Sequence, residues 1–125
     1  LLILYGTNNN KSQQHIPAAM DDFAAIVHAC QQRGTVAMLG TIPPRQWTPE
    51  SAPEANFNRH VVELCRRLKI PCGYILEAFQ AARPGNRRTF MGGGGVHWRG
   101  EGMKLAAEAW GRTMDQVRFV LRDQP

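Results

Sequence analysis

Short apolar runs alternate along the chain with segments that have helical spacing. The opening run, residues 1–5, is unbroken and stops at Gly6, which is typical of a strand buried on both faces of a parallel sheet. Runs at residues 35–42 and 70–77 predict a second and a third strand. Apolar residues spaced by three and four predict amphipathic helices at residues 16–33, 55–68 and 101–112. This alternation indicates an α/β fold, a three-layer α/β/α domain with a parallel sheet.

The helix predicted over residues 16–33 has recognisable signals at both ends. Pro17 suits the first turn of a helix, and Gly34 suits the position just after its last turn. Residues 81–95 lack such periodicity and are rich in glycine, proline and arginine, so we expect a loop there.

The tail of the chain leaves two alternatives open. Residues 113–116 read Thr-Met-Asp-Gln, the form of a capping box, which favours a helix that uses Val117, Val120 and Leu121. Val117, Phe119 and Leu121 also alternate as residues of a strand would. We prefer the helix.

A parallel sheet with right-handed crossovers places every loop that follows a strand at one edge, where ligands bind. The loops concerned are predicted at residues 6–10, 41–45 and 78–96, together with the turn at His97. Asn8 and His97 are therefore expected on the same rim, although they are far apart in the sequence.

Length and composition are those of a globular protein. The chain has 125 residues, of which 43% are hydrophobic and 20% charged, so we expect residues 1–125 to be one domain or most of one. No apolar stretch approaches the roughly 20 residues that span a bilayer, and no signal peptide is recognisable. A buried first strand needs neighbours, and no initiator methionine precedes it, so we expect further chain upstream.

The basic residues carry little specific information. Lys and Arg number 15 against 10 Asp and Glu, and Arg83, Arg87, Arg88 and Arg99 flank the glycine loop. A solvated face is the preferred interpretation, with an interaction surface at residues 83–88 as an alternative. Without interleaved aromatic residues or a binding motif, we expect no nucleic acid partner.

Three cysteines, Cys30, Cys65 and Cys72, have neither Cys-x-x-Cys nor cysteine–histidine spacing, so no metal site is predicted. We expect all three to pack in the core. The run Gly92–Gly95 lacks the Gly-Lys-Ser/Thr ending of a phosphate-binding loop, and we expect no cofactor.

The candidate chemistry lies in two segments. His97 follows Gly92–Gly95 and precedes a predicted helix, and Asn8 lies just past the first strand, an arrangement that fits a hydrolytic site. Neither serine of the chain, Ser12 or Ser51, has the Gly-flanked strand-to-helix setting of a nucleophile. Imidazole can take up and return a proton near neutral pH, and a preorganised amide can stabilise the oxyanion of ester cleavage.

These segments resemble the later sequence blocks of the SGNH hydrolases, also called the GDSL esterase/lipase family. Gly6-Thr7-Asn8-Asn9 is similar to a family block whose asparagine helps to form the oxyanion hole, which implies that role for Asn8. His97 matches the histidine of the family's Asp-x-x-His block, the base of a Ser-His-Asp triad. The strand that ends in Pro43-Pro44-Arg45 and the helix that contains Asn58 also resemble the family. The implied fold is flavodoxin-like, and the implied site residues are His97, Asn8, Gly6 and Asn9.

The sequence departs from the family pattern in three ways. The Gly-Asp-Ser block that carries the nucleophile is not in this chain. Gly94 stands where the family has the aspartate of its triad, and nothing in the spacing selects Glu77 or Glu101 as a replacement. Asn9 stands where the family has an aspartate after the oxyanion asparagine.

We therefore interpret the chain as the C-terminal portion of an esterase- or lipase-type hydrolase. The expected substrate is a small ester or an acylated carbohydrate, and the chain by itself is expected to be inactive. The alternative is a non-catalytic domain of the same fold that binds an acylated or carbohydrate ligand. For Asn8 and Asn9 themselves, the alternative to a catalytic role is a turn after the first strand. The other histidines, His15, His28 and His60, are expected on the surface or in helix packing.

Overall fold

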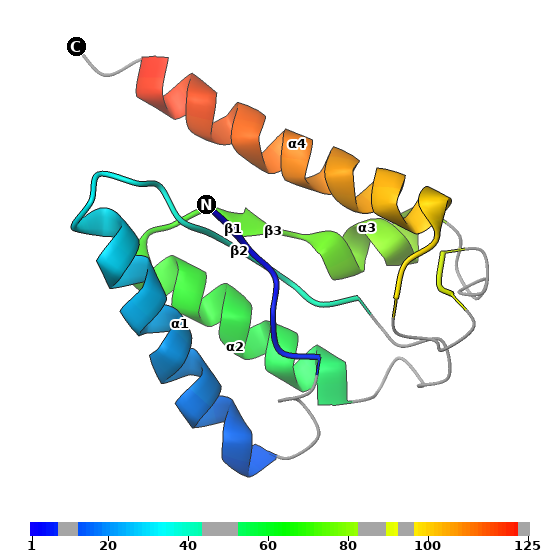
Figure 1. Ribbon diagram of the computed structural model, residues 1–125, viewed down its shortest axis with the longest axis horizontal. Helices are drawn as coiled ribbons and strands as arrows, with labels where there is room; N and C mark the ends of the chain where they lie inside the picture. The colour runs from blue at the N-terminus through cyan, green and yellow to red at the C-terminus, as the bar shows by residue number, and fades with distance from the viewer. Residues whose placement is uncertain (8–12, 44–52, 83–89, 93–96, 123–125) are drawn as a thin grey trace. The chain divides into compact units, whose positions relative to one another are not determined.

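The computed structural model describes residues 1–7, 13–43, 53–82, 90–92 and 97–122 (Figure 1). The chain divides into two compact units. The first is Leu1–Ile42 with Pro49–Cys72, and the second is Pro43–Thr48 with Gly73–Pro125. None of the described helices is long and apolar enough to cross a membrane.

Three short strands form one sheet in the order β1 (Leu2–Ile3), β2 (Met38–Gly40), β3 (Cys72–Gly73). β1 and β2 are parallel, with Leu2 opposite Met38 and Ile3 opposite Leu39. On the other side of β2, the Leu39 amide donates a hydrogen bond of 3.3 Å to the carbonyl oxygen of Pro71. The predicted α/β fold with a parallel sheet is confirmed.

The first strand is less buried than its sequence predicts. Ile3 is only 3% exposed, but Leu1, Leu2 and Tyr5 are 57%, 44% and 68% exposed. β1 lies at one edge of the described sheet, with a strand neighbour only in β2, and Ile3 is the one residue of this apolar run that is buried.

Helix α1 (Ile16–Gln31) follows a short 3-10 helix (Gln13–His15), with Pro17 in its first turn as predicted. Its end is a Schellman motif. The Gly34 amide bonds the Gln31 carbonyl at 3.0 Å, and the Thr35 amide bonds that of Cys30 at 2.9 Å. Gly34 has φ +66°, a conformation that glycine adopts without strain.

Helix α2 (Pro53–Leu68) runs beside α1 in the first unit (Figure 1). Their apolar stripes and the first two strands form one core, which includes Ile3, Phe23, Val27, Leu39, Phe57, Val61 and Leu64. α2 ends at Leu68. The next residue, Lys69, has a φ of +53°, and the Ile70 amide bonds back to the Cys65 carbonyl at 3.0 Å. This reversal leads the chain into β3.

The cysteines lie in or beside this core, as predicted. Cys65 is buried, and Cys30 and Cys72 pack against the same cluster. A hydrogen bond from Cys72 lowers the pKa of the Cys65 thiol, while burial opposes that change.

In the second unit, helix α3 (Ile75–Ala82) packs on helix α4 (Gly100–Arg122) (Figure 1). The predicted third strand over residues 70–77 is therefore wrong beyond Gly73. Ile75, Leu76 and Phe79 are all buried, which is one face of a helix, so this apolar run satisfies helical packing better than strand alternation. The loop predicted at residues 81–95 likewise starts later, because α3 includes Ala81 and Ala82.

The tail is helical, as predicted, but residues 113–116 do not cap a new helix. α4 runs without interruption from Gly100 to Arg122. Thr113 lies inside it, where its buried hydroxyl donates a 3.0 Å hydrogen bond to the Ala109 carbonyl. One turn earlier in α4, the Trp110 ring occupies the space over Gly73, where a Cβ would come within 2.6 Å of the ring.

Candidate functional site

The turn after β1 requires glycine at position 6. Gly6 is buried and has φ +114°, far from the conformations that residues with a side chain prefer. A Cβ at this position would overlap the ring of Phe57. The chain can leave the strand along this path only because the residue has no side chain.

Two helices support this turn through their aromatic residues. Phe57 of α2 is fully buried, and its ring meets that of Phe23 of α1 edge to face, with centroids 6.3 Å apart. The predicted oxyanion segment thus starts from a fixed point in the core. Its residues Asn8 and Asn9 lie outside the described part of the chain, so their roles stay predictions.

The end of the second strand is fixed by a side chain of the same helix. The Asn58 amide nitrogen donates to the Ile42 carbonyl at 2.8 Å, and the Ile42 amide donates to Asn58 Oδ1, also at 2.8 Å. Asn58 is only 4% exposed, so this pair satisfies polar groups that water does not reach. The family resemblance pointed to this helix but not to the contact. A sequence signal for it exists, because Glu54 and Asn58 are polar residues on the otherwise apolar stripe of α2.

His97 lies at the base of a loop that the backbone closes. Met91 and Trp98 form an antiparallel bridge. The Gly92 amide donates to the His97 carbonyl at 2.6 Å, and the Arg99 amide donates to that of Phe90 at 2.8 Å. α4 begins at Gly100, so the histidine is held just before a helix, as the sequence predicted.

Aromatic packing anchors this closed turn to α3. The Phe79 ring lies 5.5 Å from that of Phe90 and 5.7 Å from that of Trp98, measured between centroids. Gly102, in the first turn of α4, packs closely against the Phe90 backbone, because a Cβ at position 102 would overlap the Phe90 carbonyl oxygen. The backbone position of His97 is thereby defined by several independent contacts.

The His97 side chain is exposed. Among the described residues, no carboxylate is hydrogen-bonded to its imidazole. Glu77 and Glu101 are both exposed, each in the first turn of its helix, and Gly94 lies outside the described residues.

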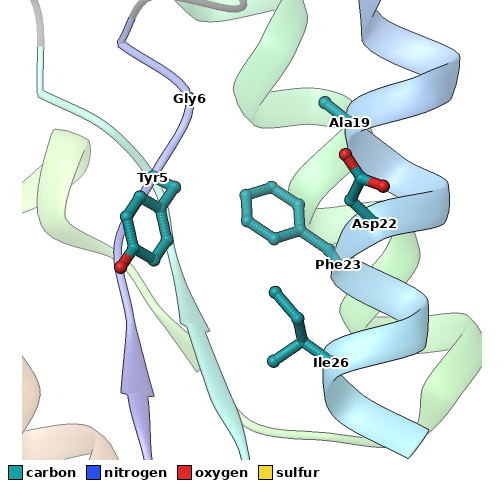
Figure 2. Close-up of a pocket in the computed structure, with 6 residues that line it drawn as sticks. All are labelled: Tyr5, Gly6, Ala19, Asp22, Phe23 and Ile26. Carbon is teal, nitrogen blue, oxygen red and sulfur yellow. The ribbon is translucent and has the colours of Figure 1, made fainter.

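A pocket of about 270 Å³ opens beside the Gly6 turn in the first unit. Tyr5 and Gly6 form one wall, and Ala19, Asp22, Phe23 and Ile26 of α1 form the other (Figure 2). Sequence reasoning did not find this pocket. Ala19, Phe23 and Ile26 belong to the expected apolar stripe of α1, and only the structure reveals that part of this stripe is uncovered.

Of the predicted site residues, the structure therefore describes Gly6 and His97, one in each unit. The expected crevice shared by Asn8 and His97 stays a prediction. Ser12, Ser51 and the basic segment 83–88 also lie outside the described residues. Within the part of the chain that is described, no cluster of three or more His, Cys, Asp or Glu residues could hold a metal ion.

Solved structures of the same fold are known. A candidate SGNH hydrolase from Slackia heliotrinireducens matches 90% of this chain with a TM-score of 0.75 at 14% identity. A GDSL-like lipase from Bacteroides thetaiotaomicron matches 93% with a TM-score of 0.65 at 16% identity. This chain covers 64% of the first structure and 60% of the second. No protein-family model and no curated protein matches it. The resemblance predicted from the sequence is confirmed at the level of the fold.

Proposed function

We propose that this chain, which has the fold of the SGNH hydrolases, supplies two of the groups that an esterase- or lipase-type hydrolase needs to cleave an ester. His97 is the proposed base, and Asn8 the proposed oxyanion donor. The nucleophilic serine comes from a segment outside these 125 residues. The proposed substrates are small esters, including acylated carbohydrates.

The observation that carries this proposal is the likeness to SGNH-type structures over 90% of the chain. Two local features support it. Gly6 directs the chain out of β1 at a point fixed by Phe57, two positions before Asn8. The closed turn before α4 holds the backbone of His97, which a general base needs in order to meet its substrate in one geometry.

In the proposed reaction, the serine hydroxyl attacks the ester carbonyl carbon while His97 takes the hydroxyl proton. The amide of Asn8 donates a hydrogen bond to the oxyanion that forms. When the intermediate collapses, the bond to the alcohol breaks and His97 returns the proton to the leaving oxygen. Water then attacks the acyl-serine with the same base, which releases the carboxylic acid and restores the serine.

A non-catalytic domain of the same fold is the second candidate. It is favoured by Gly94, which has no carboxylate at the position of the family's triad acid, and by the exposed His97 imidazole without a described carboxylate partner. Such a domain would bind an acylated or carbohydrate ligand without cleaving it.

Hydrolysis of short p-nitrophenyl esters by a protein that contains this chain and its upstream segment separates the two candidates. We expect His97→Ala to abolish turnover. Asn8→Ala should lower kcat by roughly a hundredfold or more, the usual effect of losing one oxyanion donor. The 125-residue chain itself should not be labelled by a fluorophosphonate.

His28→Ala and Asn10→Ala are matched controls. His28 is exposed on α1, where its ring bonds Gln31, and Asn10 follows the proposed donor without a proposed role. Both variants should retain full activity. If His97→Ala hydrolyses esters as fast as His28→Ala, the catalytic proposal is wrong, and ligand binding without turnover would favour the second candidate.

A further inference from the structure

The pocket beside Gly6 has an apolar interior and one charged group at its rim. Phe23 is 6% exposed and Ala19 7%, whereas Tyr5 and Ile26 are 68% and 38% exposed. In Figure 2 the Tyr5 ring faces Phe23 and Ile26 across the opening. Asp22 has the only carboxylate among the described lining residues. An apolar hollow with a few polar groups is the usual form of a small-molecule site.

The inner wall of this pocket, at Gly6 and Phe23, rests on the hydrophobic core. Behind Gly6 the space is already filled by the Phe57 ring, and Phe23 packs edge to face on that ring. Tyr5 directly precedes the glycine whose φ of +114° fixes the direction of the turn. A ligand therefore meets a wall that is set by the core.

The pocket also includes the first residue of the block proposed to act on the ester. Gly6 contributes to its wall and begins the Gly-Thr-Asn-Asn block that carries the proposed oxyanion donor. An ester has an apolar arm attached directly to the reacting carbonyl. An apolar pocket that starts at this turn is suited to receive that arm.

We propose that this pocket binds the apolar arm of the substrate, an unbranched or aromatic group that is neutral or positively charged. That the ligand is part of an ester substrate rests on the proposed function. That the pocket binds an apolar group does not. Because a cavity of about 150 Å³ accepts benzene, a pocket of about 270 Å³ has room for roughly ten carbon atoms. Asp22 disfavours an arm that ends in a carboxylate.

Chemical-shift titration of the 125-residue chain with simple alcohols tests the apolar part. Butan-1-ol, hexan-1-ol and octan-1-ol should shift the signals of Tyr5, Phe23 and Ile26. Affinity should rise about fourfold for each added methylene group, as expected for burial of apolar surface. Dissociation constants on the order of 1 mM are expected for the six-carbon probe.

A variant at the pocket mouth and its neighbour on the same helix form a matched pair. Ile26→Gln places a polar group in the opening and should weaken hexan-1-ol binding at least fivefold. Ala25→Gln changes an exposed neighbour that does not line the pocket, and its affinity should equal that of the unmodified chain. Because Ile26 is partly exposed, both variants should fold.

Charge selection is tested with hexylammonium and hexanoate. The ammonium should bind about twofold to fivefold more tightly than the carboxylate, a typical effect of one exposed charge. Asp22→Asn should remove this preference, whereas Asp21→Asn, on the adjacent exposed position, should leave most of it.

Equal hexan-1-ol affinity of Ile26→Gln and Ala25→Gln would overturn the proposal, as would shifts confined to residues outside the pocket. These outcomes do not depend on catalysis. Binding as described together with no ester hydrolysis by the longer protein would refute the proposed function alone. Hydrolysis without binding here would refute this pocket alone.

Discussion

The two turns that carry the predicted catalytic segments are stabilised in different ways. At Gly6 the chain is confined by side chains, because the Phe57 ring occupies the space where a Cβ would stand. At His97 the chain is confined by backbone hydrogen bonds, which join Gly92 to His97 and Arg99 to Phe90. The first turn therefore requires a residue without a side chain at position 6. The second turn is closed by main-chain groups that almost any residue has, and the rings of Phe90 and Trp98 anchor it to α3.

The largest loss of stability is expected from a substitution in the first turn, at Gly6. Gly6→Ala should lower the free energy of unfolding by about 3–5 kcal/mol, because it combines a strained φ with overlap on a fully buried ring. Gly34→Ala is the matched control, since Gly34 also has positive φ but a Cβ there would have no atom within 4 Å of it. It should cost only about 1–2 kcal/mol. Urea unfolding followed by circular dichroism measures both values.

A double-mutant cycle isolates the part of the Gly6→Ala stability loss that is due to overlap with Phe57. Phe57→Leu removes ring atoms from the space that the new Cβ needs, so the double variant should lose less stability than the sum of the two single variants. Strict additivity would mean that the ring does not confine this turn. The proposed difference between the two turns would then be wrong.

A smaller loss of stability is expected from a substitution where α4 meets the second turn. Gly102→Ala should destabilise by about 1–3 kcal/mol, because the overlapping atom is a backbone oxygen of Phe90 that cannot rotate away. Gly111→Ala lies in the same helix with open space around it and should stabilise by about 0.5–1 kcal/mol. Opposite signs for the two variants in thermal unfolding would support the packing described. A gain at both positions would contradict it.

The sequence predicted the elements that carry a long and regular stripe. α1 and α2 could be predicted because each has apolar residues at helical spacing over several turns, and Gly34 marks the end of the first. α3 was missed because Ile75 and Leu76 continue a short apolar run from β3, and such a run does not distinguish a strand from a helix. Only the burial of Phe79, one turn later, decides between them.

The candidate site was predictable in its local residues but not in its surroundings. Gly6 and His97 stand in recognisable blocks, so their importance follows from the residues beside them. Phe57 and Asn58, which fix the turn after β1 and the end of β2, come from a helix that no short motif connects to either strand. The exposure of Ile26 at the pocket depends on what covers α1, and periodicity contains no information about that.

The smallest change in stability is expected at Gly92. This position tests most closely whether backbone bonds, and not side-chain space, confine the second turn. Its φ is not in the positive range that favours glycine, and a Cβ would stand 3.3 Å from the His97 carbonyl oxygen, close but not overlapping. Gly92→Ala keeps the amide that donates to that oxygen, so the change in unfolding free energy should stay below about 1 kcal/mol. Amide hydrogen exchange at Arg99 should be unchanged. Gly92→Pro lacks the amide hydrogen and should speed that exchange, because the turn loses one of the two backbone bonds that its described residues form. If Gly92→Ala instead destabilises as strongly as Gly6→Ala, side-chain space and not backbone bonding confines both turns.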